Sequence, residues 1–593
     1  MRIAVLVKQV PKFEEMELGP DGRLRRDGIE LEMNPYCRRA VSKAVELAAE
    51  RDGSTVSVFT LGPPAADDTL REAIAWGLAR GVDIDGVLIT DPAFAGSDTL
   101  VTATALAGAL EREGPFDLVL VGRNSVDADT GQVGPELAEL LDLPFLTGVR
   151  HLDIEGTRVH ARCEHDDGWM QAEVELPAIL STAERLCEPA KVDPAERALV
   201  SAERIHLLTA SDVGTARRGD DSPTRVGPVK MLAATRERTR WPDEPLDVQV
   251  RNAVRMLGDR GALRSAPIGT DGEPVATSRA GTTATAMVLC EPDRAHMTRE
   301  LLGAAQQLAG NVVAVTVEPP DAITLTSWGA DEIVHLVGDN VEEDVAGAVI
   351  GLVESEQPWA LLAGSTAWGR EVASRVAARV DAGLVGDAVE LDVEDDRLIA
   401  WKPAFGGQIV AAITYGSPVQ VVTVRPGVLP TLAPRAVDGT VVHHSMPMHA
   451  RGRVRVLART REDDLDVLAE ADTVIGVGMG VPPDEYPALE PLRTLLRAEL
   501  GATRKVTDKG WLPRARQIGI TGRAIAPRLY VSIGTSGKFN HSIGVRGAGT
   551  VLAINPDRSA PIFDAADVGI VGDWREVLPL LVDALRDQLA PAG

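Results

Sequence analysis

Two stretches of this chain, about 240 residues apart, carry the same pattern of apolar and polar residues. The segment FDLVLVGRNS, which starts at Phe116, resembles PWALLAGSTA, which starts at Pro358. Two further pairs follow in the same order at nearly the same offset: one is centred on Leu152 and Leu391, and the other is formed by ELPAILST and GSPVQVVTV. Three matches in one order indicate duplication of a whole domain and not a short solenoid repeat. Chance similarity between apolar strands is the alternative.

Short β-branched runs alternate with helical patterns in the first copy. The expected strands lie at residues 3–7, 55–61, 86–90 and 117–121, and the expected helices lie at 37–50, 67–78 and 98–110. Strands that alternate with helices form parallel sheets of βαβ units. The sequence therefore predicts an α/β protein that contains two related parallel-sheet domains.

Breaks in this alternation divide the 593 residues into five predicted segments. Residues 1–216 and 284–428 are the two α/β copies, and residues 456–593 are a third, doubly wound α/β domain. Residues 217–283, which are rich in Arg, Asp, Pro and Gly, are the expected arm and linker, with one helix at 248–257. Residues 429–455, where PGVLPTLAPRA interrupts every pattern, are the expected hinge.

The composition restricts the location and partners of the chain. A net charge of −26 argues against nucleic acid and anionic membrane surfaces as partners. The four cysteines form no CxxC pair, so we expect no metal or iron–sulfur site and a reducing compartment. The first apolar run is too short for a signal peptide, and no stretch of about 18 apolar residues is present. We therefore expect a cytoplasmic protein without membrane insertion.

Glycine-rich turns follow the strand-like runs between residues 501 and 574. Runs at 529–533 and 551–554 end in small polar or glycine residues, and SIGTSGK lies between two such elements. One His, one Arg and several hydroxyl side chains fall on these turns. In an open α/β sheet, ligands bind just beyond the carboxyl ends of the strands. This stretch therefore predicts a dinucleotide site.

Longer motifs resemble the electron transfer flavoproteins, with the β and α subunits fused in that order. The β-like half contains MRIAVLVKQVP, NPYCRRAVSKAVELAAE and GRNSVDADTGQVGP; the α-like half contains GADEIVHLVGD, LLAGSTAWGREVASRVAARV, KPAFGGQIVAAI and the stretch at 501–574. The resemblance accounts for the repeat, because the β subunit and the first α domain of this family share a fold. It implies one FAD in the C-terminal domain and one AMP buried in the β-like domain. The fused chain would replace the usual αβ heterodimer.

The resemblance assigns the FAD contacts to the C-terminal stretch. Arg504 would stack on the flavin ring, where its permanent charge favours the reduced state. Thr521 would bond the flavin N5, and His541 would lie near the C2 carbonyl. The turn before His541 would present backbone N–H groups to the pyrophosphate or ring oxygens. The predicted FAD-binding set is Thr503, Arg504, Ile518, Gly519, Ile520, Thr521, Ser536, Gly537, Lys538, Phe539, Asn540, His541, Asn555, Asp573 and Trp574.

Two positions depart from the family pattern. Met479, in GVGMG, stands where an Arg commonly faces the FAD phosphates, and Arg523 or Lys538 would have to compensate. Ile520 stands where a Gln often precedes the Thr, which removes a polar contact near the ring.

The resemblance also implies a nucleotide site in the β-like domain. Asp127, Asp129 and Gln132 would bond sugar or base, and glycines would allow close backbone approach. The motif DADTGQVGP is similar to a form found in bifurcating members of the family, which hold a second FAD in place of AMP. AMP, a second FAD and an empty site all stay open here. The predicted set is Leu6, Asn34, Cys37, Leu61, Gly122, Asn124, Asp127, Asp129, Thr130, Gly131, Gln132 and Val133.

The function implied by the resemblance is that of an electron carrier without substrate turnover of its own. It would accept electrons from a dehydrogenase and pass them to a quinone-linked or soluble acceptor. Residues 184–199 are short and balanced in charge where family members that serve acyl-CoA dehydrogenases carry a Lys-rich extension, which favours a different dehydrogenase. One alternative is a bifurcating NADH-dependent oxidoreductase with a second FAD. Another is a non-redox module in which both α/β copies bind adenine nucleotides.

Overall fold

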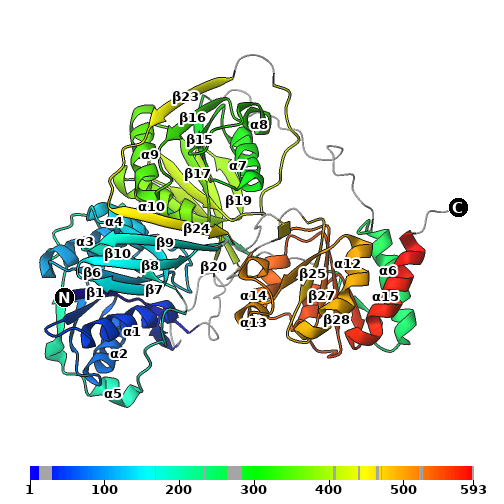
Figure 1. The fold of residues 1–593 in the computed structure, drawn as a ribbon, viewed down its shortest axis with the longest axis horizontal. Helices are drawn as coiled ribbons and strands as arrows, with labels where there is room; N and C mark the ends of the chain where they lie inside the picture. The colour runs from blue at the N-terminus through cyan, green and yellow to red at the C-terminus, as the bar shows by residue number, and fades with distance from the viewer. Residues whose placement is uncertain are drawn as a thin grey trace.

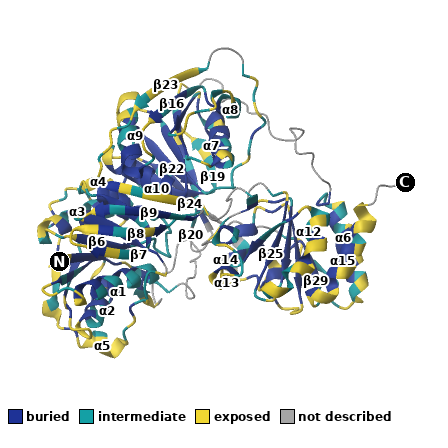
Figure 2. Ribbon diagram, in the orientation of Figure 1, coloured by how far each residue is buried: buried dark blue, intermediate teal, exposed yellow. Residues whose placement is uncertain are grey.

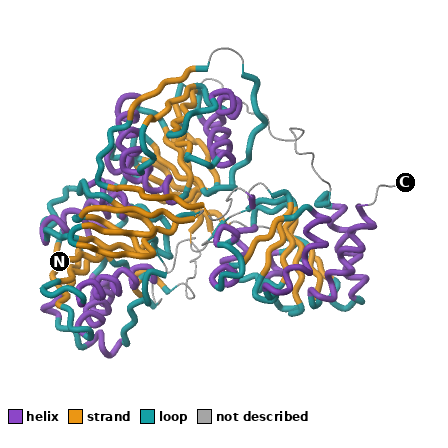
Figure 3. The backbone as a smooth tube through the Cα atoms, viewed as in Figure 1, coloured by secondary structure: helices purple, strands orange, loops and turns teal. Residues whose placement is uncertain are grey.

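The chain folds into three α/β lobes, which Figure 1 shows as separate bodies joined near the centre. The structure is a computed structural model that describes residues 1–12, 30–166, 168–183, 185–231, 236–263, 283–404, 409–437, 441–461, 467–468, 471–519, 522–523 and 525–589. Strands form the centre of each lobe, with helices outside them (Figure 3), and the central strands are largely buried (Figure 2).

The N-terminal lobe is built on a ten-stranded sheet, called here the N-terminal sheet. Its order is β11 (Ile205–Leu208), β5 (Asp83–Ile89), β4 (Thr55–Leu61), β1 (Arg2–Leu6), β6 (Leu118–Gly122), β10 (Ala178–Thr182), β7 (Phe145–Glu155), β8 (Arg158–Glu164), β9 (Gly168–Glu175) and β24 (Val454–Arg461). The strands from β11 to β7 are parallel, and β8, β9 and β24 extend the sheet in antiparallel fashion.

Helices surround this sheet, and the local sequence explains where they form. They are α1 (Pro35–Ala49), α2 (Asp67–Leu78), α3 (Thr99–Glu113), α4 (Val133–Leu140) and the short α5 (Pro194–Ala198); a small hairpin of β2 (Gln9–Pro11) and β3 (Leu31–Met33) lies beside them. Helix α1 begins with Pro35 at its first position, where no intrahelical N–H is needed. Its Ala40, Val41 and Ala44 recur at helical spacing and are buried against the sheet.

The middle lobe repeats the same strand order. Its parallel sheet runs β18 (Gly383–Ala388), β22 (Gln420–Val424), β17 (Ala360–Gly364), β14 (Thr285–Cys290), β15 (Asn311–Thr316), β16 (Glu332–Val337) and β23 (Val442–Pro447). Its helices are α7 (Ala295–Leu308), α8 (Ala322–Trp328), α9 (Glu342–Glu356) and α10 (Ala367–Arg379). Strand β14 takes the central place of β1, and β17 and β22 take the places of β6 and β10. The predicted pair of related parallel-sheet domains is therefore confirmed.

The two repeats exchange edge strands. A four-stranded antiparallel sheet extends the middle lobe in the order β12 (Thr224–Met231), β21 (Ile409–Tyr415), β20 (Arg397–Ala404) and β19 (Glu390–Glu394). Strand β12 follows the N-terminal lobe in sequence but pairs with β21, while β24 follows the middle lobe but pairs with β9. In Figure 1, β24 runs along the boundary between these lobes. The structure thus places β24 in the N-terminal sheet, although the predicted boundary at residue 456 assigns most of it to the C-terminal domain.

The C-terminal lobe has a doubly wound parallel sheet, called here the C-terminal sheet. Its order is β13 (Thr239–Arg240), β29 (Val568–Val571), β28 (Thr550–Asn555), β27 (Leu529–Ile533), β25 (Thr473–Val477) and β26 (Glu499–Ala502). Helices α12 (Glu490–Leu496), α13 (Arg504–Asp508), α14 (Phe539–Ser542) and α15 (Trp574–Leu589) accompany it. The predicted strand at 529–533 has the bounds found in the structure.

The segment predicted as an arm and linker contributes to two lobes. Strand β12 extends the middle lobe, whereas β13 pairs with β29 and helix α6 (Leu246–Asp259) packs on the C-terminal lobe. Arg236 anchors this arm, because its Nη1 donates to Oδ2 of the buried Asp567 at 2.8 Å. Parts of the predicted linker, residues 232–235 and 264–282, lie outside the described residues.

No helix in the described ranges combines the length and apolar character needed to cross a membrane.

Candidate cofactor sites

The strand order of the C-terminal sheet creates one crevice at its carboxyl edge. Strand β25 has β26 on one side and β27 on the other, so the chain reverses direction of winding between β25 and β27. Loops that leave such a point diverge, and open α/β sheets bind ligands there. The loop after β25 contains Met479, and the loop after β27 contains the predicted Ser536, Gly537 and Lys538. The predicted dinucleotide stretch therefore lies at the switch point.

Gly537 closes the turn after β27. Its φ of +69° is a conformation that residues with a β-carbon rarely adopt. A β-carbon built on Gly537 would lie 2.0 Å from the backbone nitrogen of Ile562. The turn is thus packed against the segment that follows β28, and only glycine fits it.

Cationic and hydroxyl side chains are exposed along this edge. Arg504 is the first residue of α13, directly after Thr503 at the end of β26, and its Nε donates to Oδ2 of Asp508 at 3.3 Å. Ser536 and Lys538 are exposed on the turn after β27, and Asp573 is exposed before α15. Exposed donors and positive charges suit a pyrophosphate, which carries negative charge and acceptor oxygens.

His541 lies in a buried position, and both of its ring nitrogens have protein partners. Nε2 is 2.7 Å from the hydroxyl of Tyr530, and Nδ1 is 3.1 Å from the carbonyl oxygen of Ile518. Burial lowers the pKa of His541 to about 4, so the ring is neutral at pH 7. The arrangement fits Nδ1–H donating to Ile518 while Nε2 accepts from Tyr530. A flavin oxygen would have to compete for one of these nitrogens, and the predicted role of His541 stays a prediction.

The other predicted FAD residues also gather at this edge, with several engaged by the protein. Nδ2 of Asn555 donates to the carbonyl of Thr535 at 2.8 Å, and the buried Trp574 donates from Nε1 to Gly480 at 3.0 Å. Gly519 follows Ile518 with a φ of +134°. Phe539 and Asn540 begin α14. Ile520 and Thr521 lie outside the described residues, so the structure does not place the predicted N5 contact.

Met479 packs against the apolar core of the C-terminal sheet. An Arg at this position would place a positive charge in the crevice. Arg523 and Lys538 are the two residues expected to supply that charge instead, and Lys538 is exposed at the same edge. Arg523 instead donates from Nε to the carbonyl of Ala515 at 2.8 Å. Lys538 is therefore the better placed of the two.

The N-terminal sheet has its own switch point, between β1 and β6. The buried Asn34 ties the loops there together: Nδ2 donates to the carbonyl of Asn124 at 2.7 Å, and Oδ1 accepts from the backbone of Val126 at 3.2 Å. The predicted nucleotide residues converge at this edge, with Leu6, Leu61 and Gly122 at strand ends, Cys37 in the first turn of α1, Thr130 and Gly131 in the loop, and Val133 at the start of α4.

Charged and polar side chains of the same loop differ in how they are paired. Burial would raise the pKa of Asp127, but the ammonium of Lys8, 2.8 Å away, holds that pKa below its usual range. Asp129 accepts from Nδ2 of Asn124 at 2.5 Å. Gln132 is buried and accepts from Thr99 through Oε1 at 3.0 Å, while its Nε2 has no partner within the described part of the chain.

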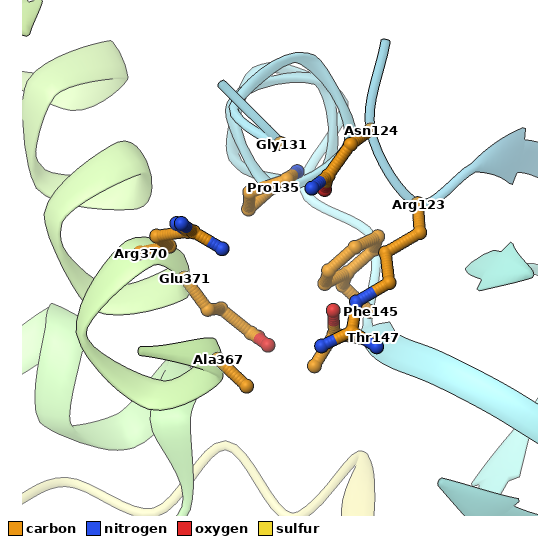
Figure 4. Close-up of a pocket in the computed structure, with 9 residues that line it drawn as sticks. All are labelled: Arg123, Asn124, Gly131, Pro135, Phe145, Thr147, Ala367, Arg370 and Glu371. Carbon is orange, nitrogen blue, oxygen red and sulfur yellow. The ribbon is translucent and has the colours of Figure 1, made fainter. Parts of the chain in front are cut away.

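A small polar pocket lies between this loop and the middle lobe (Figure 4). Its walls are Arg123, Asn124, Gly131, Pro135, Phe145 and Thr147 from the N-terminal lobe and Ala367, Arg370 and Glu371 from α10. A cavity volume of about 20 Å³ accommodates a water molecule but not a nucleotide. The pocket therefore borders the predicted nucleotide site and does not by itself contain it.

Sequence reasoning missed the contacts between lobes. Arg185, which follows β10, pairs with Asp508 of α13 at 2.7 Å, and Arg514 pairs with Glu164 at 3.3 Å. Lys402 of β20 donates to the carbonyl oxygen of Gly386 at 2.7 Å and interacts electrostatically with Asp129 of the nucleotide loop, although the motif KPAFGGQ marked the segment without assigning the lysine a role. The two ion pairs join residues more than 300 positions apart, so no local pattern predicts them.

Comparison with known proteins agrees with this arrangement. Residues 21–206 and 293–447 match the electron transfer flavoprotein domain, and residues 467–546 match the electron transfer flavoprotein FAD-binding domain. Protein FixB of Bradyrhizobium diazoefficiens is 38% identical over 307 residues, which are 49% of this chain and 83% of that protein.

Two α subunits of electron transfer flavoproteins match about half of this chain in the same way. The electron transfer flavoprotein subunit alpha of Thermoanaerobacterium thermosaccharolyticum is 35% identical over 48% of this chain and 92% of its own length, and that of Mycobacterium leprae is 33% identical over 51% and 98%. Each relative spans about half of this chain, as expected for a fusion. The two matched segments of the electron transfer flavoprotein domain together exceed half of the chain, and the chain therefore belongs to the electron transfer flavoprotein family, as a fusion of β-like and α-like halves.

Proposed function

We propose that this chain is an electron carrier that binds one FAD at the carboxyl edge of the C-terminal sheet. The observation that carries the proposal is the coincidence of the switch point between β25 and β27 with the glycine-rich turn at Gly537, inside the segment that matches the FAD-binding domain. FAD supplies the redox chemistry when it is bound, and the chain supplies binding, orientation and electrostatics.

The chain's own residues would hold the cofactor by its two ends. Ser536 and Lys538 present a hydroxyl and a positive charge on the turn after β27, where a pyrophosphate would bind. Arg504 at the start of α13 would place a planar cation beside the flavin ring. The buried His541 would keep the ring side of the site neutral and dry at pH 7.

The weak attachment of the C-terminal lobe supports a carrier role. Two ion pairs join the described residues of this lobe to those of the N-terminal lobe, Arg185–Asp508 and Arg514–Glu164, and each includes a side chain that is at least 31% exposed. Exposed pairs contribute about 0–1 kcal/mol each, so they permit reorientation of the lobe. A carrier needs such movement to approach first an electron donor, a dehydrogenase, and then a quinone-linked or soluble acceptor.

The nucleotide proposed for the β-like half is AMP, bound by the loops at the β1–β6 switch point. The middle lobe has the same fold but a different edge: Thr366 donates to Glu291 at 2.5 Å, and Asp166 accepts from the backbone of Ala367 at 2.6 Å. Protein carboxylates thus stand where a nucleotide phosphate would have to bind. This disfavours a module in which both repeats bind nucleotides.

Acid release of the bound nucleotides, followed by chromatography and quantification, tests the proposal. One FAD and one AMP per chain are expected. Release of two FAD and no AMP would instead support the alternative function, a bifurcating oxidoreductase with its second flavin in the β-like half. A chain purified from cells grown with riboflavin that released no flavin would refute the proposal.

A further inference from the structure

The N-termini of two equivalent helices, α4 and α10, differ in how the protein caps them. Helix α10 begins at the middle switch point, where Thr366 accepts from the backbone of Gly369 and Asp166 accepts from that of Ala367. Helix α4 begins at the β1–β6 switch point with Gln132 as N-cap and no side-chain cap. The positive end of a helix favours an anion. In α10 the carboxylate of Asp166 supplies that anion. In α4 no side chain caps the helix, and burial raises the pKa of the first-turn residue Glu136 to about 8, so its carboxyl group is mostly neutral at pH 7.

A buried donor beside α4 also lacks a partner. Nε2 of Gln132 makes no hydrogen bond within the described residues, although the side chain is 98% removed from solvent. Leaving a buried amide donor unpaired is costly, so such groups usually meet a ligand or an ordered water. A β-carbon built on Gly386, in β18 of the middle lobe, would lie 2.7 Å from this nitrogen. Gly386 therefore marks where the middle lobe meets the nucleotide loop.

Lys402 arrives at the same place from strand β20. Its Nζ donates to the carbonyl oxygen of Gly386 at 2.7 Å and forms no ion pair within 4.0 Å among the described residues. Burial lowers the pKa of Lys402, and the nearby carboxylates of Asp387 and Asp129 oppose that shift. Two of the three ammonium donors thus stay available for an acceptor.

The neighbouring charges leave an excess of positive charge at this point. Arg425 and Arg370 both bond the buried Asp387, so those guanidiniums are committed to a protein carboxylate. Lys8, the ammonium on the other side of the loop, is committed to Asp127. Around Lys402 lie the cations Arg370 and Arg425 and the carboxylates Asp387 and Asp129. Arg370 also faces the carboxylate of Asp166, which Arg123 balances. An added phosphate would compensate the remaining positive charge.

The repeat shows that this lysine is not required by the fold. Strands β8 and β20 each start with an Arg paired to the last residue of the preceding strand, Glu155 in one copy and Glu394 in the other. In this register Lys402 corresponds to Cys163, a small buried side chain. A charged residue therefore appears only in the copy that faces the uncapped helix.

From these juxtaposed groups we infer that Lys402 of the middle lobe binds the phosphate of the adenine nucleotide held at the N-terminus of α4, so that the nucleotide bridges the two repeats. Gln132 Nε2 and the first backbone N–H groups of α4 complete the anion site. The inference rests on the nucleotide proposed above, whether AMP or a second FAD, and does not depend on FAD in the C-terminal lobe.

Nucleotide binding to Lys402→Met and Lys402→Arg proteins tests this role. Each protein is stripped of nucleotide and titrated calorimetrically with AMP and, separately, with FAD; the nucleotides retained on purification are identified by chromatography. Loss of a charge-assisted hydrogen bond is expected to weaken the binding of the retained nucleotide about tenfold or more in Lys402→Met, with most of the affinity kept in Lys402→Arg. Lys43→Met, which removes an ammonium paired with Glu46 on α1, is the matched control and is expected to bind normally.

Flavin content separates this inference from the proposed function. Lys402→Met is expected to keep the flavin of the C-terminal lobe while losing the nucleotide of the β-like half. Unchanged affinity in Lys402→Met would overturn the inference. Should that variant fail to fold, acylation of wild-type lysines followed by mass spectrometry gives a second measurement: AMP is expected to protect Lys402, and equal modification with and without AMP would overturn the inference.

Discussion

Arg185 of the N-terminal lobe and Asp508 of the C-terminal lobe form an ion pair across the lobe boundary, with 2.7 Å between Nη2 and Oδ1. Asp508 also accepts from Nε of Arg504 at 3.3 Å. One carboxylate thus links the neighbouring lobe to the arginine predicted to stack on the flavin. Because the side chains of Arg185 and Asp508 are 45% and 38% exposed, the pair is a weak latch that the lobe can release.

Removing the carboxylate of Asp508 should shift the lobes toward separated arrangements. Loss of about 0.5–1 kcal/mol in Asp508→Asn corresponds to an increase of about two- to fivefold in the separated population. Single-molecule energy transfer between dyes on the two lobes measures this population. Asp583→Asn, which breaks an exposed pair with Arg586 on α15, is the control and should leave the distribution unchanged. If Asp508→Asn and the wild-type protein gave the same distribution of inter-lobe distances, the Arg185–Asp508 pair would not act as a latch.

The buried His541 should make the C-terminal lobe sensitive to acid. Burial lowers the folded pKa to about 4, below the unfolded value of about 6.5, so folding favours the neutral ring. The stability contributed by this difference is present above pH 6.5 and is lost as the pH falls toward 4. Between pH 7 and pH 4, the wild-type lobe should lose about 3 kcal/mol more than His541→Gln. Denaturant unfolding monitored in this lobe at a series of pH values measures this difference. The same decrease in the free energy of unfolding in both proteins would contradict the prediction.

Arg375 should matter far more for stability than its neighbour Arg379. Arg375 is fully buried between Glu139 of α4 and Glu371 of α10, at 3.4 Å and 3.2 Å. Removal of one partner from a buried ion pair costs about 3–5 kcal/mol, which is expected for Arg375→Met. Arg379 also bonds Glu139 but is 46% exposed, so Arg379→Met should cost about 1 kcal/mol or less. Equal losses in denaturant unfolding would show that burial does not govern this contact.

Asp166 should stabilise the junction of the two repeats at neutral pH. Burial disfavours its charge, but Arg123 and the backbone N–H of Ala367 overcome this and hold the pKa at about 2. This contribution is complete above the unfolded pKa of about 3.8 and is lost as the pH falls through 2. Asp166→Asn should therefore lower the free energy of unfolding by about 2 kcal/mol at pH 7 and by less at pH 3. Asp153→Asn, an exposed change on β7, should have no effect at either pH.

Local patterns predicted most of the fold, because they reflect burial of nearby residues. The run at 529–533 is buried along its whole length, and its strand has the predicted bounds. Strand β24 is different: most of Val454–Arg461 is exposed, and it forms only because its backbone pairs with β9. Nothing in an exposed sequence such as VRVLARTR identifies a partner strand that lies almost 300 residues away.

The site could be predicted in part for the same reason. Turns such as the one at Gly537 carry a local signal, and the structure places them at the switch point of the sheet. The pairing of His541 with Tyr530 and the approach of Lys402 to Gly386 depend on how separate elements pack. The spacing of residues along the sequence does not predict those contacts, so they were found only in the three-dimensional structure.

The location of FAD at the carboxyl edge of the C-terminal sheet is tested most directly by the flavin content of two glycine variants. Gly537 and Gly510 have nearly the same φ, +69° and +72°, but only Gly537 is packed against another segment. Flavin absorbance per chain should fall severalfold in Gly537→Ala and stay near one FAD in Gly510→Ala, with both N-terminal and middle lobes still folded. Equal flavin content in the two variants would contradict the proposed site.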